Sequence, residues 1–198
     1  MNSYHSHGWT HAPPGSVLSR SPLQIELKRM KGLGGLAVAL PGRVAASSVL
    51  GASDSAIQPA GVDVSVCEVL EYNEPGVLGI EARAVPRGRL LESRDGWWLL
   101  EPGAYKVRFC EVVRVPGDQV ALCFPRSSLL RMGSDLRCTV WDPGYVGRGE
   151  GLLVVYNKRG LRIQRGARVA QLVFFKLLES PHRLYEGAYQ GEGLDSRE

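Results

Sequence analysis

The sequence predicts an all-β fold. Its 198 residues include 24 glycines and 12 prolines, enough to join many short elements by tight turns. Between the turns lie short apolar runs rich in β-branched and aromatic residues, which favour strands and are too short to be convincing buried helices. A chain of this length fits one domain of ordinary size together with a tail.

The first elements are expected after residue 35. Residues 1–35 are rich in Ser, His, Pro and Gly without a sustained apolar period, which predicts a disordered tail. A short helix is predicted around Pro41 to Leu50, so the fold has a minor helical segment near its N-terminal end. Alternation of apolar and polar residues from Val62 to Val69 predicts a strand with one buried face.

The clearest β pattern runs from Trp97 to Phe124, where two Pro-Gly turns bracket a long alternating strand. The runs 152–156 and 168–177 are the most apolar and are predicted as central strands. Residues 36–180 then form the domain. The polar, Gly-rich residues 181–198 predict a mobile arm, either a frayed terminus or a flap that closes over a ligand.

The charge balance suits an anionic ligand. The formal charge is +4 and the pI about 9.0, but acidic residues are interspersed throughout, so nucleic acid is not expected as a partner. No apolar run approaches the ~20 residues that span a bilayer. We therefore expect no membrane association and a cytoplasmic location.

The four cysteines, Cys67, Cys110, Cys123 and Cys138, contain no CxxC pair, and each lies in an apolar or alternating stretch. We expect them to be reduced and buried in strands. The sequence leaves open whether two of them form a disulfide.

Polar clusters recur between the predicted strands. In order they are Ile57–Asp63 (IQPAGVD), Pro125–Leu129 (PRSSL), Asp142–Tyr145 (DPGY), Gly166–Leu172 (GARVAQL) and Tyr189–Gly191 (YQG). In this order they resemble the motifs of the deoxyUTP pyrophosphatase (dUTPase) and deoxyCTP deaminase superfamily. The resemblance covers roughly Pro41 to the C-terminus. It implies a distorted β-barrel or jelly roll of the dUTPase-like β-clip type, a homotrimer with sites between subunits, a deoxynucleoside triphosphate substrate and Mg²⁺.

Asp142 is the candidate catalytic residue. The resemblance implies a carboxylate that orients and deprotonates the water attacking the α-phosphate, while magnesium neutralises charge on the phosphates. The alternative is an Asp-Pro-Gly turn former. Tyr145 corresponds to the aromatic that the family places against deoxyribose, where a ring excludes a ribose 2′-hydroxyl.

The other motif residues suit a triphosphate. A guanidinium and two hydroxyls at 126–128 offer charge-assisted donors to several oxygens, although serines there also commonly cap helices. Asp63 supports the metal, through water, or the strand beneath it; a solvent-facing strand Asp is the alternative. The resemblance implies that Gln171 contacts substrate from the penultimate strand, and a glutamine hydrogen-bonded to the backbone is the alternative. The implied substrate-binding residues are Arg126, Ser127, Ser128, Arg131, Tyr145, Gln171, Tyr189 and Gln190.

One position separates the two activities. A deaminase needs a glutamate on the strand after the Asp142 turn to transfer protons at cytosine, and Val154 stands at that position. Glu150, the nearby carboxylate, lies four residues earlier and matches a pyrophosphatase motif. The sequence therefore predicts Mg²⁺-dependent hydrolysis of dUTP to dUMP and pyrophosphate, as in the deaminase-like, archaeal-type dUTPases.

Three alternatives stay open. The first is dCTP deamination, alone or coupled to hydrolysis, and the second is a catalytically silent member that binds nucleotides or partner proteins. The third is an oligonucleotide-binding barrel, which wants exposed aromatics interleaved with basic residues. Trp97 and Trp98 are the adjacent tryptophan pair, and core packing is the favoured interpretation of them.

Overall fold

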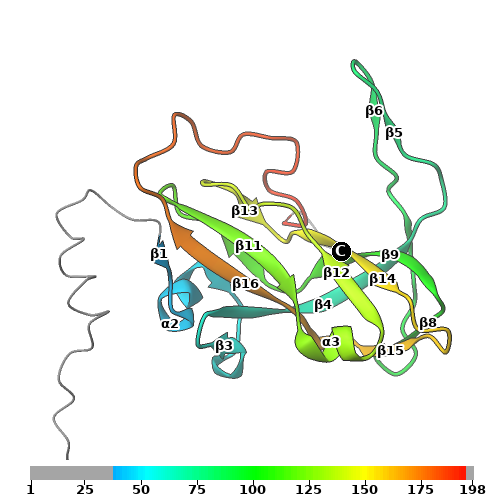
Figure 1. Cartoon of the computed structure of the whole chain (residues 1–198). Coiled ribbons are helices and arrows are strands. Elements are labelled where there is room, and N and C mark those ends of the chain that lie inside the picture. The colour runs from blue at the N-terminus through cyan, green and yellow to red at the C-terminus, as the bar shows by residue number, and fades with distance from the viewer. Residues whose placement is uncertain (1–37, 195–198) are drawn as a thin grey trace, which may run out of the picture. The chain divides into compact units, whose positions relative to one another are not determined.

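A computed structural model of the chain describes residues 38–194 (Figure 1). The tail predicted for residues 1–35 and the last residues of the predicted arm, 195–198, lie outside this range. The described part consists mostly of short strands with few helical turns, which confirms the all-β class and the minor helical segment. No helix in this part is long and apolar enough to cross a membrane.

The elements follow one another closely along the chain. In order they are β1 (Val38–Ala39), α2 (Gly42–Ala45), the 3₁₀ helix η2 (Ala46–Ser48), β2 (Val49–Leu50), the 3₁₀ helix η3 (Asp54–Ala56), β3 (Ile57–Gln58), β4 (Gly61–Glu71), β5 (Val77–Leu78), β6 (Arg83–Ala84), β7 (Arg89–Leu90), β8 (Trp97–Leu100), β9 (Gly103–Phe109), β10 (Val112–Arg114), β11 (Gln119–Pro125), α3 (Ser127–Arg131), β12 (Ser134–Arg137), β13 (Val146–Gly147), β14 (Glu150–Val155), β15 (Leu161–Gln164) and β16 (Arg168–Lys176).

One curled antiparallel sheet forms the body of the domain. Its strands pair in the order β1-β16-β4-β9-β14-β12, and β11 pairs with the other side of β16. The curl brings β11 close to β12, where Ala121 and Trp141 form an isolated antiparallel bridge. The chain therefore forms the predicted distorted barrel, with a gap in strand pairing between β11 and β12.

Side-chain alternation explains the core. Along β9 and β14 every second residue is buried, as expected when one face of a strand packs inward. The strand β4 is buried along almost its whole length because it lies in the middle of the sheet. The strands expected at 62–69, 152–156 and 168–177 are therefore present, with boundaries moved by one or a few residues.

The predicted helix around Pro41 to Leu50 is shorter than expected. Pro41 caps α2, which passes into η2 and ends at Ser48. Val49 then pairs with Val113 of β10 as part of β2. Pairing with β10 thus ends the helix before its predicted boundary.

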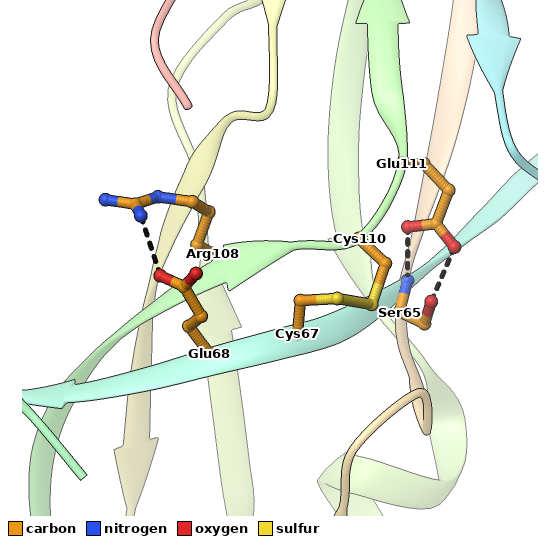
Figure 2. Close-up of a disulfide and its surroundings, with 6 residues drawn as sticks. All are labelled: Ser65, Cys67, Glu68, Arg108, Cys110 and Glu111. Atoms are coloured by element: carbon orange, nitrogen blue, oxygen red, sulfur yellow. Dashed lines mark hydrogen bonds and ion pairs between the residues drawn. A yellow bond between two sulfur atoms is a disulfide. The ribbon is translucent and has the colours of Figure 1, made fainter. Parts of the chain in front are cut away.

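A disulfide joins Cys67 and Cys110 (Figure 2), so the prediction of reduced cysteines is wrong for this pair. Cys67 lies in β4 at the point where the register of its pairing with β9 shifts, and Cys110 directly follows β9. Their Cα atoms are 4.8 Å apart, within the range that a disulfide spans. Strand pairing brings together two residues that are 43 positions apart in sequence.

The carboxylate of Glu111 lies beside this disulfide and is buried (Figure 2). It accepts hydrogen bonds from the backbone N–H and the hydroxyl of Ser65, at 2.9 and 2.5 Å. These bonds satisfy a buried acidic side chain, as burial of a carboxylate requires.

The two adjacent tryptophans have different environments. Trp98 is buried and its indole N–H donates to the carbonyl of Leu91 at 2.9 Å. Trp97 is partly exposed, with the guanidinium of Arg162 over its ring at 5.0 Å. Core packing is thus the right interpretation for Trp98 and not for Trp97.

Candidate active site

The predicted site residues fall into two groups that line separate cavities of the single chain, and Asp142 also borders a further cavity with residues 181–187 of the arm. The first, of about 420 Å³, is lined by Asp142, Tyr145 and Tyr189 of the predicted set. The second, of about 340 Å³, is lined by Asp63, Arg126, Ser127 and Gln171. Gln190 forms hydrogen bonds to residues 144 and 146 beside the first cavity. Ser128 and Arg131 line neither of these two cavities and are exposed.

The Asp142 turn is held by backbone hydrogen bonds. The N–H of Tyr145 donates to the carbonyl of Asp142 at 3.1 Å, and Gly144 adopts a positive φ of 88°. Such a φ suits glycine, which has no Cβ to clash. Val115 pairs with the C-terminal end of the turn, where its N–H donates to the carbonyl of Tyr145 and its carbonyl accepts from the N–H of Gly144. The turn is thereby fixed while the Asp142 carboxylate is exposed at the cavity.

An aromatic wall lines the first cavity. Trp141 and Tyr145 meet edge to face with ring centroids 5.2 Å apart, and Tyr145 meets Tyr185 at 5.7 Å. Gly149 lies against the Trp141 ring so closely that a Cβ there would collide with it. The wall therefore depends on a glycine at position 149.

Glu150 brings a second carboxylate to this cavity, and it is already paired. Arg108 donates to it at 2.9 Å and Lys106 lies 3.3 Å away. Arg108 also pairs with Glu68 at 2.6 Å, as Figure 2 shows in part. Two cations hold Glu150, which leaves its charge compensated.

The arm packs against the Asp142 turn. The N–H of Tyr185 donates to Pro143, and that of Gly191 to Val146, both at 2.8 Å. The Gln190 side chain bonds the backbone in both directions, donating to Gly144 and accepting from Val146 at 3.0 Å. The arm thus covers the cavity, and its mobility stays a prediction.

Glu192 is a residue that sequence reasoning missed. Its carboxylate lines the first cavity and accepts a hydrogen bond of 2.7 Å from the Tyr145 hydroxyl. Burial, and then the charge of Glu150, raise the pKa of Glu192 above its ordinary value. Burial and the bond to Glu192 also raise the pKa of Tyr145. The available signal was an acidic residue directly after the motif Tyr189–Gly191, two positions beyond Gln190.

Asp63 lines the second cavity and its side chain is fully buried, so it is not a solvent-facing strand residue. Its Oδ2 forms ion pairs with Arg126 and, at 3.5 Å, with Arg168. Its Oδ1 has no hydrogen-bond partner among the described residues. Gln171 lies directly opposite Asp63 in the pairing of β16 with β4 and lines the same cavity. The cavity thus combines an arginine, a hydroxyl and an amide around a carboxylate.

The serines follow Arg126 into the short helix α3. Arg126 occupies the N-cap position, and no side chain caps this helix. The alternative that these serines serve as helix caps is therefore not what the structure contains. Ser127 lines the second cavity, and Ser128 is exposed to solvent.

The donor set limits how a divalent metal is held. Within residues 38–194, no three His, Cys, Asp or Glu side chains gather into a group that could bind one. The unpaired Oδ1 of Asp63 and the amide of Gln171 are hard oxygen donors of the kind that magnesium prefers, directly or through water. With so few protein donors, these residues fit a magnesium ion only where its other ligands come from outside the chain.

Comparison with known proteins connects these features to a family. Residues 43–177 match the family model described as dCTP deaminase-like. The chain is 53% identical over 146 residues to a probable deoxyuridine 5′-triphosphate nucleotidohydrolase of Aeropyrum pernix, covering 74% of this chain and 92% of that protein. A protein of the same name from Halobacterium salinarum is 39% identical over 163 residues, covering 79% of this chain and 96% of that protein.

A solved structure shares the fold. The 2′-deoxycytidine 5′-triphosphate deaminase of Agrobacterium tumefaciens superposes with a TM-score of 0.55 at 21% identity. The match covers 71% of this chain and 48% of that one, so the chain spans about half of its length. Together with the family match and the archaeal relatives, this confirms the resemblance carried by the five motifs: the chain belongs to the dCTP deaminase-like family.

Proposed function

We propose that this protein hydrolyses dUTP to dUMP and pyrophosphate with Mg²⁺. The observation that carries the proposal is an exposed carboxylate, Asp142, at a cavity whose aromatic wall contains Tyr145. The names of the archaeal relatives support dUTP as the substrate. Magnesium, when bound, neutralises charge on the phosphates and makes the α-phosphate easier to attack.

Asp142 orients a water molecule and accepts its proton as the water attacks the α-phosphate. The fixed turn around Gly144 gives the carboxylate a defined position, which lowers the entropic cost of aligning the water. Tyr145 packs against the sugar, where its ring leaves no room for a 2′-hydroxyl. Pyrophosphate leaves in line with the attacking water.

The second cavity is the proposed phosphate half of the site. Arg126 and Ser127 provide a guanidinium and a hydroxyl, and Arg168 adds a second cation beside Asp63. Charge-assisted donors of this kind bind several phosphate oxygens at once. Asp63 would help to hold a magnesium ion through water, and Gln171 contacts the substrate from β16.

A homotrimer joins the two halves. Because the two groups of residues line different cavities of one chain, we propose that Asp142 and Tyr145 of one copy meet Arg126 and Ser127 of another. The exposed Ser128 and Arg131 then face the neighbouring copy and its substrate. The arm residues Tyr189 and Gln190 close the pocket over the nucleotide, which excludes water.

A mixing experiment tests the shared site. Asp142→Asn and Arg126→Ala proteins, each of low activity, are unfolded together and refolded. Random mixing restores about one quarter of the sites if each site takes its halves from two copies. A mixture no more active than its components contradicts the shared site, without bearing on which substrate is used.

The substrate assay decides between hydrolysis and deamination. Purified protein is incubated with Mg²⁺ and either dUTP or dCTP, and pyrophosphate and ammonia are measured. We expect pyrophosphate from dUTP and no ammonia from dCTP, because Val154 transfers no proton and Glu150 is held by Arg108 and Lys106. Ammonia release from dCTP, or unchanged dUTP, contradicts the assignment, and unchanged nucleotide in both supports a silent member.

A further inference from the structure

We propose that Cys123 and Cys138 form a second disulfide, which closes the barrel across the gap between β11 and β12. The proposal concerns the fold around the first cavity and does not depend on the proposed function. It rests on the separation of the two sulfur atoms, their place in the sheet and their shared packing.

The two Sγ atoms are 2.6 Å apart. Non-bonded heavy atoms in optimal contact are roughly 3.5–4.0 Å apart, and sulfur is larger than carbon. The two thiols are therefore already nearer to each other than packing alone brings such atoms. Both side chains are partly buried and pack on the margin of the hydrophobic core.

Their position in the fold gives the link a structural role. The backbones of β11 and the segment after β12 meet at the bridge between Ala121 and Trp141, with two hydrogen bonds of 3.0 and 2.9 Å. Cys123 lies two residues beyond Ala121 on β11, so both side chains point to the same face. Cys138 lies three residues before Trp141. A bond between the sulfurs reinforces this bridge.

A glycine of β14 lies beside Cys138. A Cβ built at Gly151 would lie 3.4 Å from the Sγ of Cys138. The sulfur of Cys138 thus rests on the backbone of β14 while it faces Cys123 of β11. The link connects β11 to the residue directly after β12, and these two strands do not pair with each other in the sheet.

The chemistry is ordinary thiol–disulfide exchange. Two S–H bonds break, one S–S bond forms between Cys123 and Cys138, and two protons and two electrons pass to an oxidised disulfide, which becomes two thiols. The oxidant is a small-molecule or protein disulfide. Because Cys138 directly precedes Thr139 and Val140, which line the first cavity, the oxidised link also restrains that wall.

Peptide mapping tests the proposal. Full-length protein is incubated with glutathione disulfide, denatured in iodoacetamide and digested without reductant for mass spectrometry. We expect a linked peptide pair containing Cys123 and Cys138 as well as the pair containing Cys67 and Cys110. Alkylation of both Cys123 and Cys138 overturns the proposal, whatever the state of the other pair. A link that joins Cys123 or Cys138 to Cys67 or Cys110 overturns it as well.

Two matched variants add a readout of folding. In Cys67→Ser/Cys110→Ser the second link remains, and dithiothreitol should lower the Tm by about 6–12 °C, as expected for opening a loop of this length in a domain of this size. In Cys123→Ser/Cys138→Ser, any change in Tm on adding dithiothreitol should come from the disulfide between Cys67 and Cys110 alone. An unchanged Tm of the first variant on reduction contradicts the proposal, and the peptide map applies even if a variant folds poorly.

Discussion

The hydroxyl of Tyr145 donates a hydrogen bond of 2.7 Å to the carboxylate of Glu192 and so joins the Asp142 turn to the arm. The other bonds between turn and arm use a backbone group on at least one side and do not titrate. Within the described part of the arm, up to residue 194, docking therefore has one direct hydrogen bond to the turn that changes with pH.

Arm docking should weaken as pH rises. In the docked arm, burial and the charge of Glu150 raise the pKa of Glu192 above its ordinary 4.5, against the opposing effects of Tyr145, Arg108 and Lys106. The docked state therefore holds the proton more tightly than the released state. Docking is fullest below pH 4.5 and weakens between pH 4.5 and the raised pKa.

Tryptophan fluorescence titrated from pH 4 to about 8 checks this expectation, because Trp141 contacts Tyr145. Glu192→Gln should lose the transition, since the amide is neutral throughout. Glu186→Gln, which changes an exposed glutamate of the same arm, is the control and should titrate like the parent. A Glu192→Gln titration identical to the parent's contradicts the assignment.

Asp142→Asn should lower kcat about 10²–10⁴-fold with little change in substrate affinity. The amide keeps the shape of the side chain but accepts no proton from water. Steady-state kinetics and nucleotide binding measured separately distinguish the two effects. Asp118→Asn, which changes an exposed carboxylate paired with Lys176, should retain parental kcat. Near-parental turnover by Asp142→Asn excludes Asp142 as the base.

Asp63→Asn should cost about 1–3 kcal/mol of the free energy of unfolding, because it leaves two arginines without their buried partner. The side chains of Arg126 and Arg168 are 29% and 40% exposed, so water compensates part of the loss. Urea denaturation measures the change. Glu71→Gln breaks an exposed pair with Arg89 and should cost at most about 1 kcal/mol. Equal losses in the two variants contradict the importance of burial.

Gly149→Ala should destabilise the protein by about 1–3 kcal/mol, since the new methyl group collides with the Trp141 ring. Moving that ring also disturbs the cavity wall, so KM should rise. Gly103→Ala is the matched control, because a Cβ there meets its nearest neighbours at an ordinary 3.7 Å. Thermal unfolding and kinetics of both variants check the prediction, which fails if they behave alike.

Local pattern was enough to predict the long strands. Alternation along β9 and the apolar runs of β14 and β16 depend on burial of one strand at a time, which the sequence displays directly. The helix after Pro41 ends earlier than predicted because residues 49–50 pair with β10. The sequence of the helix itself does not reveal this pairing with a distant strand. The barrel itself followed from family resemblance and not from periodicity.

The details of the site depend on pairing between distant segments. Cys67 meets Cys110 because β4 pairs with β9 through a register shift, which spacing along the chain does not reveal. Asp63 is buried because β16 covers β4 on one side. Glu192 reaches Tyr145 only when the arm docks. Residue types in the sequence were enough to predict candidate site residues. Their burial and their interaction partners could be known only from the folded structure.

The aromatic wall of the first cavity has an optical consequence. Phe109, Trp141, Tyr145 and Tyr185 form a continuous line of rings from the buried core to the arm, with successive centroids 6.1, 5.2 and 5.7 Å apart. At such short range, the excitation energy that Tyr145 or Tyr185 absorbs is transferred efficiently to the indole of Trp141. Trp141 is consequently a built-in acceptor, and its excitation spectrum reports how close Tyr185 of the arm lies.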